Sequence, residues 1–441
     1  MPDIKSRALL ATGAGGLPSE DISRALADSL EPALNSLNKV LLIPPDYTRL
    51  HANAGLITES LYGLLSPRSQ VDILPALGTH VPVSEKEWGL MFPGIPIQAM
   101  RVHNWRTDLV RLGEVPAGFV REVSGGLMDA AIPVEVNRHL VEGGYDLILS
   151  IGQVVPHEVV GMANHSKNIL VGCGGTGMIN ASHMLGALYG MERIMGRPNT
   201  PVRKVLDYAS EHLLSSLPIH YILTVTDAPG GVVRTHGLFM GPGREGFERA
   251  AALAQQVNIT WLERPVNKAV VYLDGLEFKS TWLGNKAVYR TRMALEDGGE
   301  LLVLAPGVDR FGEDPAVDAL IRKYGYRGRD SILGALKTTP DLQASLSAAA
   351  HLIHGSSEGR FTITYCPQHL TQDEVEGVSY AYLPYQEAVR RYPPDRLQEG
   401  FNTLPDGGEV YFIRNPALGL WVDQSRHSGE AGFAPPVGGT A

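Results

Sequence analysis

Short runs of mainly hydrophobic residues alternate with amphipathic segments along this chain. Such runs stop at proline or glycine at residues 40–43, 71–77 and 147–151, and recur at 269–273, 301–304 and 361–365. Helical patterns lie between the later runs, at 279–295 and 315–323. Apolar runs that alternate with helices are typical of parallel βα units. The pattern predicts an α/β fold with two doubly wound α/β domains and a cleft between them.

Domain limits follow from a polar link and from the composition of the tail. A proline-bearing segment at 261–265 separates a glycine-rich first half from the second set of strands. We predict an N-terminal catalytic, cofactor-binding domain over 1–263 and a C-terminal α/β domain over 264–424 that completes the substrate cleft. Residues 425–441 are rich in Gly, Ser, Pro and Ala, which predicts a flexible tail.

Composition narrows the classes of partner. A chain of 441 residues can form two hydrophobic cores. Its formal net charge of −9 argues against nucleic acid or an anionic membrane as a partner, and favours a small molecule. No apolar run approaches the roughly 20 residues of a membrane span, and we expect a soluble, cytoplasmic protein. The two cysteines, Cys173 and Cys366, exclude a disulfide framework and a four-cysteine metal site.

Reactive side chains follow three of the predicted strands. Asp46 and Arg49 come after the first, His80 after the second and His157 after the third. Because ligands bind beyond the carboxyl ends of strands in open α/β sheets, we expect these four side chains to converge on one crevice. Each alone also has an ordinary interpretation, as a helix cap, a surface ion pair or a loop histidine.

A second group of candidates lies in the segment 156–183. Lys167 and His183 carry an amine and an imidazole, which are able to bind a metal, carry a proton or bond to a cofactor. Between them, Gly174, Gly175 and Thr176 belong to a glycine-rich turn before a predicted helix, where N–H groups are able to cradle a phosphate. Tight turns also need glycine, and the turn fits neither the P-loop nor the dinucleotide motif.

These blocks resemble the lactate racemase family, whose enzymes use a nickel-pincer nucleotide. The resemblance covers most of the first half in matching order and spacing, and continues more weakly in the second half. The matching segments are 46–49, 78–80, 103–104, 112–113, 132–138, 157–167 and 180–183, then 282–286, 296–299 and 380–388.

The resemblance implies a cofactor and its attachment. The cofactor would be nickel pyridinium-3,5-bisthiocarboxylate mononucleotide, made by cofactor-maturation proteins and covalently attached at Lys167. His183 would be the protein's ligand to the nickel, a geometry suited to Ni(II). Thr48 would contact the cofactor, as would the glycine-rich turn.

The resemblance also implies roles around the substrate. His80 and His157 would act as general acid and base while hydride passes between the substrate alcohol and the cofactor. Asp46 would orient one of these histidines. Arg49 would bind a carboxylate or another anionic group of the substrate through its planar guanidinium.

Departures from the family pattern concern the substrate. Leu283 stands where lactate racemases carry a glutamine, three residues before Lys286, and leucine cannot hydrogen-bond a carboxylate. Trp282 and Lys286 stay candidate substrate-binding residues. We therefore expect an alcohol or hydroxy acid other than lactate, such as a sugar acid, a polyol or a bulky hydroxy acid. His165 is open to three interpretations: substrate contact, a core or solvated role, or a second metal site with a neighbouring histidine or Cys366.

Three functions stay open from the sequence. The leading one is a nickel-pincer nucleotide-dependent racemase or epimerase that acts at a secondary alcohol. A second keeps the cofactor but carries out net alcohol oxidation or ketone reduction. A third is a non-redox nucleotide-binding protein, which gives no reason for the histidines at two strand ends.

Overall fold

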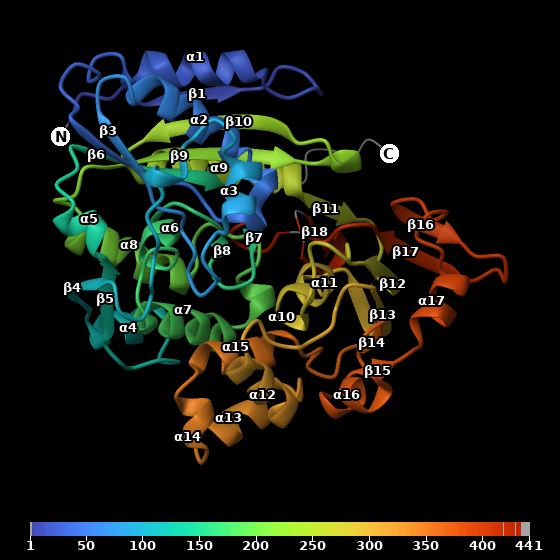
Figure 1. Ribbon diagram of the computed structural model, residues 1–441. Coiled ribbons are helices and arrows are strands. Elements are labelled where there is room, and N and C mark those ends of the chain that lie inside the picture. The colour runs from blue at the N-terminus through green and yellow to red at the C-terminus, as the bar shows by residue number, and fades with distance from the viewer. Residues whose placement is uncertain (1, 418, 428, 434–441) are drawn as a thin grey trace. The chain divides into compact units, whose positions relative to one another are not determined.

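In a computed structural model that describes residues 2–417, 419–427 and 429–433, the predicted apolar runs form strands of two sheets. The side chain of Thr48 lies outside the described part. The chain divides into one unit of residues 1–185 and 196–258 and a second of 186–195 and 259–441. Each unit is α/β (Figure 1), as predicted. The predicted domain limits at 263 and 424 stay a prediction.

The first unit is built on a six-stranded sheet in the order β1-β10-β9-β6-β2-β3. Its strands are β1 (Arg7–Leu10), β2 (Lys39–Ile43), β3 (Gln70–Ile73), β6 (Leu147–Gln153), β9 (Ile219–Asp227) and β10 (Arg234–Gly241). Strands β9, β6, β2 and β3 are parallel, and β10 is antiparallel to both its neighbours. The chain leaves β2 for β3 on one side and returns as β6 on the other. The carboxyl ends of β2 and β6 therefore form a topological switch point, where such sheets bind ligands.

Helices and short hairpins complete the first unit. The helices are α1 (Ser19–Leu30), α2 (Ala54–Leu65), α3 (Glu85–Met91), α4 (Ala117–Val123), α5 (Arg138–Glu142), α6 (Ser166–Leu170), α7 (Thr176–Tyr189), α8 (Pro201–Leu213) and α9 (Arg244–Asn258), with 3-10 turns η1 (Tyr47–Ala52), η2 (Ile97–Ala99), η3 (Met191–Arg193) and η4 (Pro229–Gly231). The hairpins pair β4 (Leu109–Val115) with β5 (Ile132–Asn137), and β7 (Pro156–His157) with β8 (Gly161–Met162). The end of α7 and all of η3 belong to the second unit.

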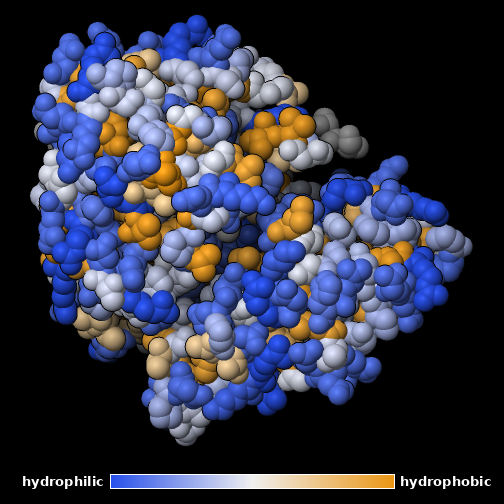
Figure 2. Space-filling view, in the orientation of Figure 1, coloured by the Kyte–Doolittle hydropathy of each residue, from blue (hydrophilic) through white to orange (hydrophobic). Residues whose placement is uncertain are grey.

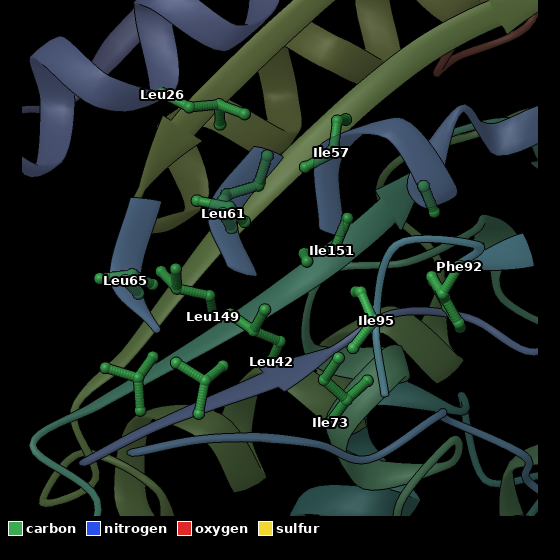
Figure 3. Close-up of a cluster of buried hydrophobic side chains, with 14 of the residues drawn as sticks. Leu26, Leu42, Ile57, Leu61, Leu65, Ile73, Phe92, Ile95, Leu149 and Ile151 are labelled. Atoms are coloured by element: carbon green, nitrogen blue, oxygen red, sulfur yellow. The ribbon is translucent and has the colours of Figure 1, made fainter. Parts of the chain in front are cut away.

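Helices α1 and α2 cover a hydrophobic core on one face of this sheet. Leu42, Ile73 and Leu149, from three neighbouring strands, pack in one cluster with Ile57 and Leu61 of α2 (Figure 3). Strand β2 is buried on both faces, as expected for a central parallel strand. Each fully buried Leu or Ile contributes roughly 1.5–3 kcal/mol. This core makes the strand ends that carry the candidate residues rigid.

The second unit has its own six-stranded sheet in the order β15-β14-β13-β12-β17-β16. Its strands are β12 (Val266–Tyr272), β13 (Leu295–Ala305), β14 (Thr362–Pro367), β15 (Ala381–Tyr382), β16 (Gly400–Thr403) and β17 (Glu409–Ile413), and a separate pair joins β11 (Ile259–Leu262) to β18 (Leu420–Asp423). Only β16 is antiparallel to its neighbour within this sheet. The helices are α10 (Thr281–Gly284), α11 (Lys286–Thr291), α12 (Pro315–Tyr324), α13 (Arg329–Leu336), α14 (Pro340–Gln343), α15 (Leu346–His354), α16 (Gln372–Gly377), α17 (Tyr385–Arg391) and α18 (Gln424–His427).

Two predicted elements differ from the observed ones. The single helix predicted at 279–295 is two short helices, α10 and α11, and its last residue already belongs to β13. Ser280 caps α10 by accepting the N–H of Leu283, and the chain turns at Asn285 between the helices. The strand predicted at 71–77 ends at Ile73, because Pro75 has no N–H to donate to a sheet.

The tail and the surface add two observations. Residues 424–427 form α18, where Ser425 bonds to Asp423, whereas 428 and 434–441 of the predicted tail lie outside the described residues. On the face shown in Figure 2, hydrophobic residues form small groups among polar ones. Within the described ranges, no helix combines the length and the apolar character needed to cross a membrane.

Candidate functional site

The ends of β2 and β3 bring Asp46 and His80 together. His80 Nδ1 donates a hydrogen bond to Asp46 Oδ2. The two loops lie side by side because β2 and β3 are paired and a bridge joins Pro45 to Ala76. The Asp46 side chain is only 7% exposed, whereas that of His80 is 30% exposed. With its proton on Nδ1, a neutral His80 presents Nε2 as a base.

Arg49 follows on the 3-10 turn η1, directly after β2. Its N–H donates to the carbonyl of Asp46 at 3.1 Å, and its backbone departs from helical geometry. The positive charge of Arg49 acts on Lys167, whose pKa it lowers after the larger effect of burial. Arg49 and Lys167 therefore share one electrostatic environment, although more than a hundred positions of sequence separate them.

Lys167 lies in the first turn of α6, which side-chain bonds tie to the sheet. Asn168 Nδ2 donates to Ile43 O at 3.2 Å and to Ser150 Oγ at 3.0 Å, and so links α6 to the ends of β2 and β6. The Lys167 residue is partly accessible, but protein atoms crowd its amine, and burial is the main reason that its pKa falls to about 8. A neutral amine is a nucleophile, which a protonated one is not.

His183 on α7 has a defined tautomer. Its Nδ1 donates to Ile179 O at 2.7 Å, one turn earlier, so Nε2 carries the lone pair. Burial is the main reason that the pKa of His183 falls to about 4, and the charge of Lys167 contributes to this fall. His183 is thus neutral at physiological pH, with the nitrogen that a metal requires.

His157 and Glu158 follow β6 on the short strand β7 and its turn. The N–H of Val159 donates to His157 Nδ1 at 3.1 Å, so a neutral His157 carries its proton on Nε2. Glu158 Oε2 lies 3.9 Å from His157 Nδ1. The negative charge of Glu158 raises the pKa values of both Lys167 and His183, partly offsetting burial. Glu158 is therefore a member of the cluster to which the sequence analysis assigned no role.

The glycine-rich turn is explained by packing. The N–H of Gly174 donates to Val171 O at 3.4 Å and that of Gly175 to Glu135 O at 3.2 Å. A Cβ at Gly174 would collide with the carbonyl of Leu170, and one at Gly175 would meet the Glu135 carboxylate. Both N–H groups are therefore engaged within the protein, and the phosphate contacts predicted for Gly174, Gly175 and Thr176 stay a prediction.

His165 has a core position. Its ring lies 4.0 Å from the ring of Tyr221 and 5.3 Å from that of Phe247, and burial lowers its pKa to about 3. Its Nε2 lies 3.3 Å from Gly243 O, to which it donates. Of the three interpretations, these contacts favour the core role.

A buried arginine that the sequence analysis missed holds the turn before Lys167. Arg203 on α8 is fully buried and donates to Met162 O at 2.6 Å, to Asn164 O at 3.2 Å and to Ser166 Oγ at 3.0 Å. Its guanidinium lies 4.3 Å from the centre of the Phe247 ring. The signal was present in the sequence, because Arg203 interrupts the apolar face of a helix that otherwise buries Val202, Val205 and Leu206.

The candidate substrate residues of the second half belong to the second unit. Trp282 stacks on His351, with 4.3 Å between the ring centres. Lys286 is buried, and its Nζ lies 5.4 Å from the centre of the Phe278 ring. Leu283, three residues earlier, has no polar atom in its side chain. Their contact with a substrate stays a prediction, as does that of Thr48, whose side chain lies outside the described residues.

The cluster fits a metal held mainly by a cofactor. Within the described residues, no group of three or more His, Cys, Asp or Glu side chains is arranged to hold a metal ion. His183 belongs to no such group, and the charges of Lys167 and Glu158 act on it. The second metal site considered for His165 has no such group in the described part of the chain either.

Fold and site together define an α/β protein with histidines and a buried lysine amine close to a sheet switch point. Residues 17–195 match the family model of the lactate racemase N-terminal domain. Residues 17–195 therefore resemble the N-terminal domain of lactate racemases. No curated protein sequence matches the chain.

Two solved structures are similar over nearly the whole chain. A protein from Thermotoga maritima, solved by a structural genomics consortium, shares 26% identity with a TM-score of 0.79, covering 94% of this chain and 99% of that one. The lactate racemase apoprotein from Thermoanaerobacterium thermosaccharolyticum has a TM-score of 0.66 and 17% identity, covering 92% and 93%, and shows a shared fold. The domain match over residues 17–195 supports a racemase-type function.

Proposed function

We propose that this protein is a nickel-pincer nucleotide-dependent racemase or epimerase that acts at a secondary alcohol other than lactate. The observation that carries the proposal is the pairing of Lys167 with His183 in one electrostatic cluster. Burial makes the lysine amine nucleophilic, and the bond to Ile179 leaves His183 Nε2 unprotonated. These are the two properties that covalent attachment and nickel ligation need.

The residues present fit this cofactor. Lys167 would hold it covalently and His183 would ligate its nickel, and when bound the cofactor would supply a hydride acceptor for the substrate. Asn168 and Arg203 keep the Lys167 turn in place through bonds to the strand ends and to the preceding loop. The chain's own task is then to position the alcohol and to move its hydroxyl proton.

The two histidines are set up for opposite proton transfers. His80, with Nδ1–H bound to Asp46, offers a basic Nε2, whereas His157, whose Nδ1 accepts the N–H of Val159, exchanges protons through Nε2. One enantiomer loses its hydroxyl proton to neutral His80, and the product of inversion receives a proton from His157 in its imidazolium form. Proton exchange with water then restores both rings for the next turnover. The reverse reaction needs the opposite states, which histidine reaches near neutral pH.

Substrate selection would depend on Arg49 and on the altered anchor in the second unit. The Arg49 guanidinium is suited to a carboxylate or another planar anion. The hydrophobic Leu283 removes a hydrogen-bonding partner but leaves Lys286 as a cation. A sugar acid, a polyol or a bulky hydroxy acid matches this change better than lactate does.

The test begins with maturation of the full chain in a host that expresses the cofactor-maturation proteins. We expect one nickel per chain and an added mass on Lys167, measured by metal analysis and peptide mass spectrometry. Lys167→Ala should lose the covalent mass, whereas His183→Gln should keep the mass and lose nickel. A screen of hydroxy acids and polyols for inversion would then identify the substrate.

The control is a lactate racemase matured in the same host. If that protein acquires nickel and this chain stays nickel-free with unmodified Lys167, the proposal is wrong. Nickel loading together with deuterium returned only to the original face of the substrate would instead indicate net redox chemistry.

A further inference from the structure

An arginine-rich cavity of about 350 Å³ lies in the second unit, and none of the candidate site residues lines it. Its volume is at the small end of the range for ligand pockets. The charged side chains that line it are Glu192, Arg193, Arg292, Arg329, Glu358 and Arg360. Four arginines and two glutamates line the cavity, and Asp297 outside the lining pairs with Arg360 at 2.8 Å, in a chain whose net charge is −9. A local positive concavity on a negative protein concentrates anions.

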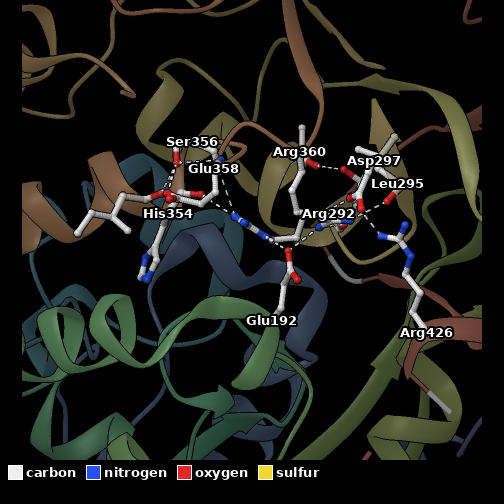
Figure 4. A network of polar contacts seen from close by, with 12 residues as sticks. Glu192, Arg292, Leu295, Asp297, His354, Ser356, Glu358, Arg360 and Arg426 are labelled. Carbon is white, nitrogen blue, oxygen red and sulfur yellow. Dashed lines mark hydrogen bonds and ion pairs between the residues drawn. The ribbon is translucent and has the colours of Figure 1, made fainter. Parts of the chain in front are cut away.

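Two of the four arginines, Arg292 and Arg360, form ion pairs with Glu192 on one side of the cavity. Arg292 Nε and Arg360 Nη1 both donate to Glu192 Oε1, at 3.1 and 2.7 Å (Figure 4). Arg292 also donates to Ser356 O at 3.3 Å, and Arg360 to the carbonyl of Leu295 at 2.9 Å. These guanidinium groups are therefore largely committed to contacts within the protein.

The other two arginines have no carboxylate partner among the described residues. The Arg193 guanidinium lies 4.0 Å from the centre of the Tyr189 ring and bonds weakly to Tyr189 O at 3.5 Å. The Glu358 carboxylate is nearby, but it accepts the backbone N–H of Arg329 at 3.0 Å and the hydroxyl of Ser356. Arg193 and Arg329 thus face a preformed cavity with their charges unneutralised.

We propose that this cavity binds a small dianion of the phosphate type, held by the guanidinium groups of Arg193 and Arg329. The planar guanidinium groups match the oxygen geometry of a phosphate, and a dianion matches the two positive charges of Arg193 and Arg329. Half of the lining comes from residues 187–193, where the chain passes between the two units. The bound anion therefore stabilises this crossover segment.

The test uses the full chain without cofactor and inorganic phosphate as the probe. Phosphate is titrated by calorimetry and by thermal melting, with sodium chloride holding the ionic strength constant. We expect saturable binding and a rise in Tm that follows it. Arg193→Gln and Arg329→Gln should each raise the apparent Kd roughly tenfold, since charged hydrogen bonds are lost, and the double variant should show no saturable binding.

The matched control removes two exposed arginines of the same unit that do not line the cavity, Arg327→Gln and Arg396→Gln. This double variant has the same net charge and should bind phosphate like the wild type. Phosphate that stabilises the wild type no more than chloride does, or that binds equally to the Arg193/Arg329 double variant, overturns the proposal. If the Arg193/Arg329 double variant has a much lower Tm than the wild type, the phosphate affinities of the two single variants decide between the outcomes. Neither outcome bears on nickel loading at Lys167, so the two proposals fail separately.

Discussion

At the residue scale, hydrogen bonds to ring nitrogens give the histidines of the cluster different chemistry. His80 and His183 both donate from Nδ1, one to a carboxylate and one to a backbone carbonyl, whereas His157 accepts at Nδ1. The other ring nitrogen is therefore unprotonated in neutral His80 and His183 and protonated in neutral His157, and the proposed roles of base, metal ligand and proton donor use that nitrogen. Three residues of one type thus acquire three capacities from their second nitrogen alone.

The lowered pKa of Lys167 predicts the pH dependence of its reactivity. Burial and the nearby Arg49 favour the neutral amine, so its acylation rate should rise with pH around a midpoint of about 8 instead of the usual 10.5. The rate should be low below pH 7, where the amine is protonated. Pulse labelling of the cofactor-free protein with acetic anhydride, followed by peptide mass spectrometry, measures the midpoint for Lys167.

Arg203 provides the control for this interpretation. Its charge also lowers the pKa of Lys167, so Arg203→Met should move the acylation midpoint to higher pH. The exposed Arg396→Met should leave the midpoint where it is. A midpoint near 10.5 in the wild type would mean that the amine is solvated and that the proposed attachment lacks its nucleophile.

At the scale of elements, the close approach of α6 to the start of α7 explains the glycine-rich turn. A Cβ at Gly172 or at Gly174 would collide with a backbone carbonyl of α6, and a Cβ at Gly177 would collide with Pro133 of β5. The glycines therefore permit a helix, a turn and a strand to pack without side chains between them. A phosphate loop has the same composition, which is why sequence alone left both interpretations open.

Alanine substitutions at two glycines should have opposite effects. Gly174→Ala collides with the carbonyl of Leu170, and we expect a loss of about 1–3 kcal/mol in the free energy of unfolding. Gly63→Ala, on the exposed side of α2 with open space around it, should gain about 0.5–1 kcal/mol. Urea unfolding measures both. Equal stability of the two variants would show that the turn relaxes and that packing does not require glycine there.

At the scale of the whole molecule, the chain passes between the two units three times, and residues 186–195 group with the second unit. Glu192 anchors this segment through Arg292 and Arg360. Burial alone would raise the pKa of Glu192, but the two guanidinium groups outweigh burial and lower it. A carboxyl with a lowered pKa stabilises the fold above its unfolded pKa, and this contribution is lost as pH falls through the folded pKa.

Glu192→Gln should therefore cost about 1–3 kcal/mol of stability at neutral pH. The difference from the wild type should shrink below the usual glutamate pKa of 4.5, as wild-type Glu192 becomes protonated. Urea unfolding at pH 7 and at pH 4 or below measures the two differences. Glu248→Gln, which breaks an exposed ion pair with Arg244, is the control and should change stability little at either pH. A difference that does not depend on pH would contradict the assigned ion pairs.

Much of this architecture could be predicted from periodicity. The apolar runs at 40–43, 147–151 and 301–304 became central parallel strands, because burial on both faces requires near-continuous hydrophobic sequence. Asp46 follows the run at 40–43 and His80 the run at 71–77, and the pairing of β2 with β3 places these two residues side by side. The helix predicted at 279–295 failed because a buried serine cap and a turn at Asn285 overrode a helical pattern.

The sequence by itself determined the α/β class, the strand ends and the residue types available there, since these depend on local hydrophobic pattern and order along the chain. Only the tertiary structure decided which nitrogen of each histidine carries the proton, how far burial lowers the pKa of Lys167, and that Arg203 secures its turn. It also placed Glu192 with two arginines a hundred or more positions away. These properties depend on desolvation and on contacts between distant segments, which no local pattern encodes.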